Sequence, residues 1–386
     1  MTDQKIADTS FTIDWLSDLL RKRADLKVDL EKWEAKAISQ GKGYLSTIVS
    51  VSLKWQLPNQ LLPNEVVLKI PNTAAAASAL TNVKLDDWLT FAHSHECQSY
   101  ELLKDGAVPV PKLFYSQPIS DGRSGVLVME NLANGATGNF VDGLTREQVY
   151  SVTTGLAKIH AHCLTLDPTN WNSIYHVDDL HHKTLRTELL AAVVDRVGQC
   201  LKSFPSLACA RSMEAVLQKF DKYFMYEMPF EVHLDLGLPA VLVHGDLWAN
   251  NVMFARDQRQ KAGSKLIAMF DWQLSHPGNC MEDLCVLLCV SCSGRLRHEE
   301  CGKLLRHYYK SLCELMDDQV PFSFGQVEQA FQRSLPIALM FFVYSVPLWQ
   351  SMADVSQSVD PKLSVDVLAE RLHMLIEDVW PDCYRE

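Results

Sequence analysis

The chain has 386 residues, of which 47% are hydrophobic and 22% are charged, and its formal net charge is −11 at pH 7. This length predicts two domains or two lobes, and the composition excludes a disordered chain, a collagen-like repeat and a small disulfide-rich scaffold. The acidic balance, with no long basic run, argues against a nucleic acid or an anionic membrane surface as the partner.

The eleven cysteines are irregularly spaced, and no apolar signal segment stands at the start of the sequence. We therefore expect free thiols, a reducing compartment and a cytoplasmic location. The apolar segment at residues 335–349 holds Pro336 and Pro347 and is shorter than the roughly 20 residues that span a bilayer. We expect it to form a buried helix and no membrane span.

The first predicted elements are a helix and two strands. Residues 11–22 carry apolar side chains at helical spacing, which predicts an amphipathic helix. Residues 49–55 alternate between apolar and polar side chains and predict a half-buried strand, and a second strand is expected at residues 65–70.

A glycine-rich turn precedes the first of these strands. Gly41 and Gly43 would let backbone N–H groups approach a phosphate closely, and Ser46 follows them. A plain hairpin turn is the alternative for the same residues.

The next predicted element is a helix at residues 85–104, where apolar side chains recur at helical spacing. Glu96 falls within the apolar stripe, whereas Glu101 lies on another face and is expected to meet water. A carboxylate directed toward a core needs a cation, and Lys69 on the preceding strand is the candidate. A purely structural ion pair is the alternative to a functional one.

The boundary between two lobes is placed after the apolar run at residues 125–129, where Glu130, Asn131 and Leu132 follow. Residues 1–130 then form a strand-rich first lobe, and residues 131–386 form a second lobe that is mainly helical. Helices of the second lobe are predicted at residues 145–161, 183–202, 211–227, 282–291, 299–317, 324–349 and 361–379.

Two short apolar runs interrupt this helical region, at residues 241–243 and 266–270, and we expect both to be strands. The first run leads into Asp246, which follows a His-Gly pair, and the second leads into Asp271. Asn251 lies between them, five positions after Asp246. An ordered set of this kind is rare by chance, so it is the strongest functional signal in the sequence.

These residue types suit phosphoryl transfer, in which a protein mainly positions the reactants and neutralises charge. Asp246 could accept the proton of an attacking hydroxyl, while Asn251 and Asp271 supply the hard oxygen ligands that Mg²⁺ prefers. Lys69, held by Glu96, could anchor the α- and β-phosphates of a nucleotide. A capped loop beside a core strand is the alternative for Asp246 and Asn251.

Two neighbours of this set are expected to be structural. His244 should bond the backbone of its own loop. Asp283, at the start of a predicted helix, could either stabilise that helix terminus or support the loop that carries Asp246.

The same segments resemble a known family. HGDLWANN at residues 244–251, FDWQ at residues 270–273, VVLKIP around Lys69 and the helix segment 96–100 are similar to motifs of the ecdysteroid kinase-like (CHK kinase-like) family. That family is related to choline kinases and aminoglycoside phosphotransferases. The resemblance implies an α+β, protein-kinase-like two-lobe fold, with a small β-rich N-lobe that binds nucleotide and a larger, mainly helical C-lobe for catalysis and the acceptor.

The resemblance further implies an ATP-dependent kinase that uses Mg²⁺ and phosphorylates a hydroxyl group of a small molecule. The positions carried over are a catalytic base (Asp246), metal ligands (Asn251, Asp271), a phosphate-anchoring pair (Lys69, Glu96) and a hinge beside adenine (Glu130, Asn131, Leu132).

The chain departs from the protein-kinase pattern at several points. Ser46 stands where a third loop glycine would be, His-Gly-Asp replaces His-Arg-Asp, and no Ala-Pro-Glu segment follows Asp271 at the usual distance. The last difference argues against a protein substrate. We expect a small hydroxyl compound, either an amino alcohol or a sterol-like lipophilic alcohol, and aromatic residues of the second lobe could line either pocket.

Other classes of protein stay open. The same residues could belong to a catalytically silent nucleotide-binding scaffold. Cys285, Cys289 and Cys292 have a spacing that could hold an iron–sulfur cluster, although they also share one face of a predicted buried helix. His160 and His162 lack partners for a zinc site and are expected to face solvent or lie at a helix end.

Overall fold

The protein is described by a computed structural model. It places residues 4–38, 46–57, 61–72, 85–120, 122–171, 232–355 and 361–381. The predicted helices at residues 183–202 and 211–227 lie outside this part of the chain, as does the turn with Gly41 and Gly43.

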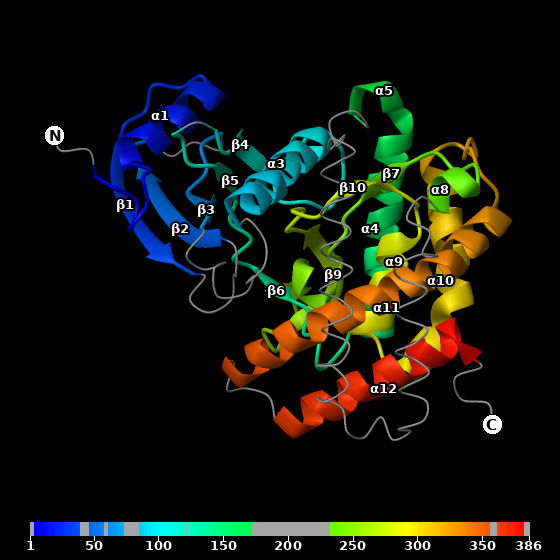
Figure 1. The fold of residues 1–386 in the computed structure, drawn as a ribbon. Helices are drawn as coiled ribbons and strands as arrows, with labels where there is room; N and C mark the ends of the chain where they lie inside the picture. Colours follow the sequence, from blue (N-terminus) through cyan, green and yellow to red (C-terminus); the bar gives the residue numbers. More distant parts are fainter. Residues whose placement is uncertain are drawn as a thin grey trace. The chain divides into compact units, whose positions relative to one another are not determined.

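The chain divides into two compact units (Figure 1). Unit 1 consists of Met1–Asp105, Val110–Ala133 and Trp272–Leu274, and unit 2 consists of Gly106–Pro109, Asn134–Asp271 and Ser275–Glu386.

Unit 1 is built on an antiparallel sheet with the strand order β1-β2-β3-β5-β4. Its strands are β1 (Leu30–Ala37), β2 (Ser46–Trp55), β3 (Glu65–Pro71), β4 (Leu113–Gln117) and β5 (Val126–Glu130). The strand β3 has a hydrogen-bonded partner on each side, β2 and β5, so a side chain on β3 is held in the middle of the sheet.

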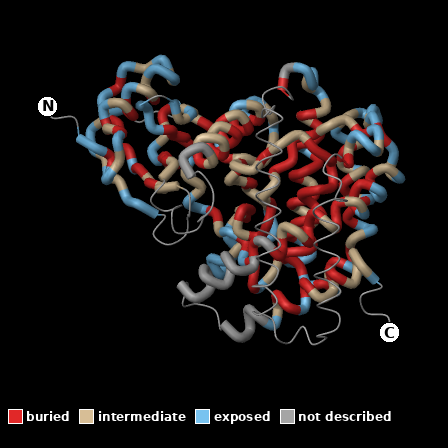
Figure 2. Tube along the Cα trace, viewed as in Figure 1, coloured by how far each residue is buried: buried red, intermediate tan, exposed pale blue. Residues whose placement is uncertain are grey.

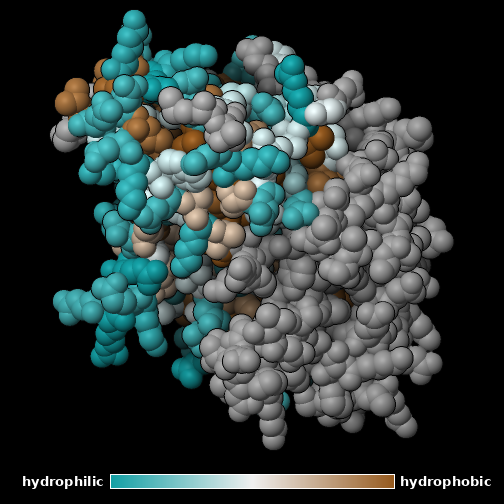
Figure 3. All heavy atoms as spheres, turned by 90° about the vertical axis from the view of Figure 1, so that its left-hand side faces the viewer, coloured by the Kyte–Doolittle hydropathy of each residue, from teal (hydrophilic) through white to brown (hydrophobic). Residues whose placement is uncertain are grey.

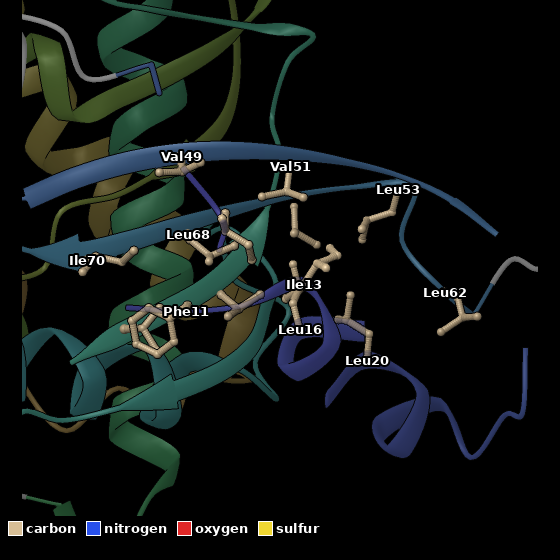
Figure 4. Close-up of a cluster of buried hydrophobic side chains, with 14 of the residues drawn as sticks. Phe11, Ile13, Leu16, Leu20, Val49, Val51, Leu53, Leu62, Leu68 and Ile70 are labelled. Atoms are coloured by element: carbon tan, nitrogen blue, oxygen red, sulfur yellow. The ribbon is translucent and has the colours of Figure 1, made fainter. Parts of the chain in front are cut away.

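The helix predicted near the N-terminus is confirmed as α1 (Ile13–Ala24), which begins where the Thr12 hydroxyl accepts a hydrogen bond from the backbone N–H of Trp15. Its buried side chains Leu16 and Leu20 pack with sheet residues in one apolar cluster (Figure 4). The alternation predicted for β2 is confirmed, since its apolar positions are buried and Ser52 and Lys54 are exposed.

The strand β1 was not predicted from its sequence, LEKWEAKA, which has no buried residue. It lies at the edge of the sheet, where only one neighbouring strand is needed and charged side chains can meet water. The face of the molecule in Figure 3 is largely hydrophilic outside the grey atoms, as the exposed charges of β1 lead one to expect.

The helix α3 (Leu85–Leu103) matches its prediction, and Glu101 is exposed on it as expected.

Unit 2 contains two small antiparallel sheets and a group of helices. One sheet has the order β6-β8-β9, and the strands β7 and β10 form the other. The strands are β6 (Gly135–Thr137), β7 (Val241–Val243), β8 (Val252–Arg256), β9 (Ala262–Met269) and β10 (His276–Gly278). The two short strands predicted in this region are β7 and β9, although β9 begins at Ala262, before its predicted start, and ends one residue earlier than expected.

The described helices of unit 2 include one that is wholly buried. They are α4 (Arg146–Thr165), α5 (Pro168–Trp171), α8 (Val232–Asp235), η3 (Ala249–Asn251), α9 (Glu282–Ser291), α10 (Gly294–Leu315), α11 (Phe324–Val355) and α12 (Pro361–Val379). All ten residues of α9 are buried, and Figure 2 shows the buried residues gathered along the inner helices. This burial agrees with the run from Leu284 to Val290, which is apolar on every side.

Several helix boundaries differ from the predictions, and α4, for example, continues to Thr165. The helix α10 begins at Gly294 because the Ser293 hydroxyl accepts from the N–H of Leu296 and caps it. The helix α11 continues beyond its predicted end to Val355, and Leu339 and Phe342 on it are fully buried, as expected for this part of the helix. Among the described helices, none combines the length and apolarity that a membrane crossing requires.

Candidate functional site

In unit 1, the ammonium of Lys69 on β3 lies 2.7 Å from the Glu96 carboxylate on α3. Their side chains are only 10% and 2% exposed, so each charge depends on the other for its stability inside the protein. The ion pair predicted from the sequence is therefore present, and whether it binds phosphate stays a prediction.

A histidine that the sequence did not single out fastens α3 to the sheet. His93 Nε2 lies 2.9 Å from the carbonyl oxygen of Gln117 on β4, so the ring donates its proton there. Burial lowers the pKa of His93 to about 4, which keeps the ring neutral. A Cβ at Gly125 would come within 2.4 Å of the ring, so this close approach requires a glycine.

The predicted hinge residues lie at and beyond the end of β5. The N–H of Glu130 donates to the carbonyl of Lys112, and the Glu130 carboxylate accepts from the N–H of Lys112 at 3.3 Å. Asn131 donates from its side-chain amide to the Ser50 hydroxyl at 3.1 Å. Leu132 is half-buried, and Glu130 is exposed at the strand end.

The glycine-rich turn cannot be placed beside these residues, because Gly41 and Gly43 are outside the described part of the chain. Ser46 is described as the first residue of β2, where it pairs with Pro71 on β3.

In unit 2, the loop after β7 carries Asp246, and Asn251 holds its carboxylate. The Asn251 side-chain nitrogen donates to Asp246 Oδ2 at 3.0 Å and to the Asp246 backbone carbonyl at 2.8 Å. The backbone N–H of Asp246 donates to Nδ1 of His244 at 3.3 Å. These bonds fix both the backbone and the carboxylate of Asp246.

His244 joins this loop to the strand end that precedes Asp271. Because its Nδ1 accepts from Asp246, its proton is on Nε2, which lies 2.9 Å from the carbonyl oxygen of Phe270. His244 is fully buried. The ring thus contacts the backbone of Asp246 and Phe270, in agreement with the predicted structural role.

Asp271 follows β9 in a backbone conformation that is rare for residues other than glycine, with φ = 72°. The preceding residue, Phe270, donates its N–H to the carbonyl oxygen of Asn251 at 3.1 Å. Local strain of this kind persists only where the surrounding structure imposes it, and it is concentrated at functional sites.

The donors present here fit Mg²⁺. The Asn251 side chain donates from its nitrogen to Asp246, and its amide oxygen and the Asp271 carboxylate are hard oxygen donors. Such hard oxygen donors suit Mg²⁺, which usually takes one or two protein ligands together with phosphate oxygens.

Asp283, near the start of α9, binds the backbone of the loop that carries Asp246. Its two carboxylate oxygens accept from the N–H groups of His244 at 2.7 Å and Gly245 at 3.1 Å. Burial raises the pKa of Asp283 to about 7. Of the two roles that the sequence left open, the structure shows loop support.

Cys285 and Cys289 lie on α9 and Cys292 directly follows its last residue, and all three thiols are buried. Cys289 accepts from the guanidinium of Arg297 at 3.8 Å. The described ranges contain no group of three or more His, Cys, Asp or Glu side chains arranged to hold a metal ion.

The expectation for His160 was wrong. His160 is 1% exposed within α4, and its Nδ1 lies 2.8 Å from the hydroxyl of Tyr308 on α10. The sequence missed this because Tyr308 is 148 positions away, and only the packing of the two helices brings them together.

Two curated relatives come from Caenorhabditis elegans. The chain is 24% identical over 285 residues to the uncharacterized oxidoreductase dhs-27, a match that covers 70% of this chain and 34% of that protein. It is 23% identical over 325 residues to the uncharacterized kinase-like protein D1044.1, covering 80% of this chain and 79% of that one. The chain thus spans about a third of the length of dhs-27.

Solved structures show a likeness in fold. Choline kinase from Cryptosporidium parvum Iowa II aligns with a TM-score of 0.51 and 15% identity, over 91% of each chain. A protein from Ralstonia eutropha JMP134, provisionally assigned as an aminoglycoside phosphotransferase, aligns with a TM-score of 0.50 and 14% identity, over 96% of this chain and 98% of that one.

These likenesses confirm the predicted α+β, kinase-like two-lobe fold. None of the four proteins is named as an ecdysteroid kinase, so that part of the resemblance stays a prediction. The family match runs over residues 6–383, and the chain therefore belongs to the DUF1679 family, described as uncharacterized oxidoreductase dhs-27.

Proposed function

We propose that this chain is an ATP-dependent kinase that transfers the γ-phosphate to a hydroxyl group of a small molecule. The observation that carries the proposal is the arrangement of Asp246 and Asn251, in which a loop carboxylate is held at 3.0 Å by a side-chain amide. Phosphoryl transfer needs such positioned groups more than it needs covalent chemistry by the protein.

The proposed role of Asp246 is to accept or orient the proton of the acceptor hydroxyl. Asn251 holds the carboxylate in one orientation, and His244 holds the Asp246 backbone. A base that is fixed in this way loses no orientation entropy when the acceptor arrives.

Asn251 and Asp271 are the proposed Mg²⁺ ligands. When bound, Mg²⁺ supplies positive charge against the phosphate oxygens. The hydrogen bond from the N–H of Phe270 to the Asn251 carbonyl ties the two ligands' segments together, which supports this pairing.

Unit 1 is proposed to hold the nucleotide. Lys69, whose buried ammonium is held by the Glu96 carboxylate, would contact the α- and β-phosphates. The backbone at Glu130 and Leu132 is proposed to border adenine, and the turn of Gly41, Gly43 and Ser46 to approach the phosphates.

The acceptor is proposed to be an amino alcohol or a lipophilic alcohol, with no protein substrate. The likeness in fold to a choline kinase supports a small acceptor. A cytoplasmic location remains part of the proposal.

Turnover decides the proposal. The purified chain is incubated with Mg²⁺, γ-labelled ATP and a metabolite extract, followed by panels of amino alcohols and lipophilic alcohols, and labelled products are identified by mass spectrometry. We expect transfer that EDTA abolishes and that Asp246→Asn lowers at least about 100-fold. Asp257→Asn is the matched control, because Asp257 is an exposed loop carboxylate of the same unit.

Two outcomes would contradict the proposal. If ATP raises the melting temperature but no acceptor is labelled, the chain is a silent nucleotide-binding scaffold. Equal turnover of Asp246→Asn and the wild type would refute the role of Asp246.

A further inference from the structure

The helix α9 contacts the loop of Asp246 at two places. Asp283, near the start of α9, accepts from His244 and Gly245 at one end of the loop. Ser291, the last residue of α9, accepts at its hydroxyl from the backbone N–H of Ala249 at 2.8 Å. The loop is therefore held on both sides of Asp246 by one buried helix.

The bond from Ala249 replaces a cap that the local sequence lacks. Ala249 begins the short helix η3, and the residue before it, Trp248, makes no side-chain capping bond. The first N–H groups of a helix have no partner within it. Ala249 and Ser291 are both fully buried, so the Ser291 hydroxyl does for this N–H what water does at an exposed terminus.

The backbone of Ser291 is itself fixed by a hydrogen bond to another segment. Its carbonyl oxygen accepts from the N–H of Leu144 at 2.7 Å. One residue earlier, the carbonyl of Val290 accepts from the guanidinium of Arg371 at 2.9 Å, and that side chain is 2% exposed. The end of α9 is thus a fixed point to which the loop is attached.

We propose that Ser291 is a positioning residue for phosphoryl transfer, acting through Ala249 on the loop that carries Asp246 and Asn251. The inference rests on the proposed function for its kinetic consequence only. Without the hydroxyl, the buried N–H of Ala249 has no acceptor, and η3 shifts to bring it to another partner. Displacing a reacting group by about 1 Å can cost about 100-fold in rate, so a loop with partial freedom loses activity before it loses its fold.

The first test measures the loop itself and does not depend on turnover. Amide hydrogen exchange is followed at residues 244–252 in the wild type and in Ser291→Ala, Ser291→Thr and Ser334→Ala. Ser334 is the matched control, since it is a fully buried hydroxyl that accepts at 3.0 Å from a buried donor, the Asn279 amide, outside the loop.

We expect exchange at Ala249 to rise at least about 10-fold in Ser291→Ala while α9 stays protected. Ser291→Thr keeps a hydroxyl and should keep the protection, even if its extra methyl lowers the melting temperature. The inference is overturned if Ser291→Ala exchanges like the wild type, or if Ser334→Ala or Ser291→Thr loosens the loop equally.

The second test applies once an acceptor is known. Ser291→Ala should lower kcat about 10-fold with the KM for ATP within about twofold, and Ser291→Thr should restore kcat. A normal kcat in Ser291→Ala overturns the positioning role. Absence of turnover in the wild type refutes the proposed function instead, and the exchange experiment still decides whether Ser291 holds the loop.

Discussion

Lys69 and Glu96 are 27 positions apart in the sequence and form an ion pair at 2.7 Å, with side chains that are 10% and 2% exposed. A second pair in unit 1, Lys54 with Glu31, has the same separation of 2.7 Å, but its side chains are 65% and 48% exposed. The two pairs differ in burial and not in length, so together they form a natural comparison.

Glu96→Gln should destabilise the protein far more than Glu31→Gln. Glu96→Gln breaks a buried ion pair, which costs roughly 3 kcal/mol, whereas an exposed pair contributes roughly 0–1 kcal/mol. Urea unfolding of both variants measures the difference. Similar midpoints for the two would show that the Lys69 charge is solvated despite its burial.

Asp283→Asn should destabilise the loop of His244 and Gly245. The two N–H groups occupy both carboxylate oxygens, so the amide nitrogen of asparagine would face a donor. A buried N–H without an acceptor costs about 1–3 kcal/mol. Thermal unfolding measures the loss, with Asp142→Asn as a control at an exposed position of unit 2; equal melting temperatures would contradict the anchoring role.

The stability of unit 2 should fall in acid because of His160. Burial lowers its pKa to about 3, whereas in the unfolded chain a histidine titrates near 6.5. Between these values the unfolded state binds more protons than the folded one, so the free energy of unfolding decreases as the pH falls from about 6.5 to 3.

The pH dependence of unfolding for His160→Gln tests this. Its free energy of unfolding should depend less steeply on pH in that window than that of the wild type. His298→Gln, which changes a histidine whose side chain is 46% exposed, is the control. Parallel curves for His160→Gln and the wild type would refute a neutral buried ring.

Gly138→Ala should destabilise the contact between the start of unit 2 and the loop that carries Asp246. An added Cβ would lie 2.6 Å from the backbone carbonyl of Ala249, so backbone must move, at a cost of about 1–3 kcal/mol. In contrast, Gly302→Ala at an exposed position of α10 should stabilise by up to about 1 kcal/mol, because its Cβ meets only the end of the Arg306 side chain at 3.4 Å. Thermal melting of the two variants, shifting in opposite directions, checks both.

Local sequence patterns predicted much of the fold. They failed for an exposed edge strand and for a contact between residues far apart in the sequence. Alternation identified β2 because one of its faces is buried, and it missed β1 because an edge strand with exposed charges carries no such signal. Helical spacing located α3 and α9, and it did not reveal that His160 is buried against Tyr308.

The sequence by itself determined which chemistry the chain can hold: an Asp-x₄-Asn loop, a later strand-terminal Asp271, and a Lys69–Glu96 pair whose carboxylate lies in an apolar stripe. Tertiary structure alone decided how the loop is held, since Asp283 and Ser291 reach it from 39 and 42 positions away. The physical reason is that the type and spacing of side chains indicate only the helix or strand in which they lie. Which backbone N–H group it satisfies depends on the burial of α9 beside the loop, and every polar group buried there must find a partner.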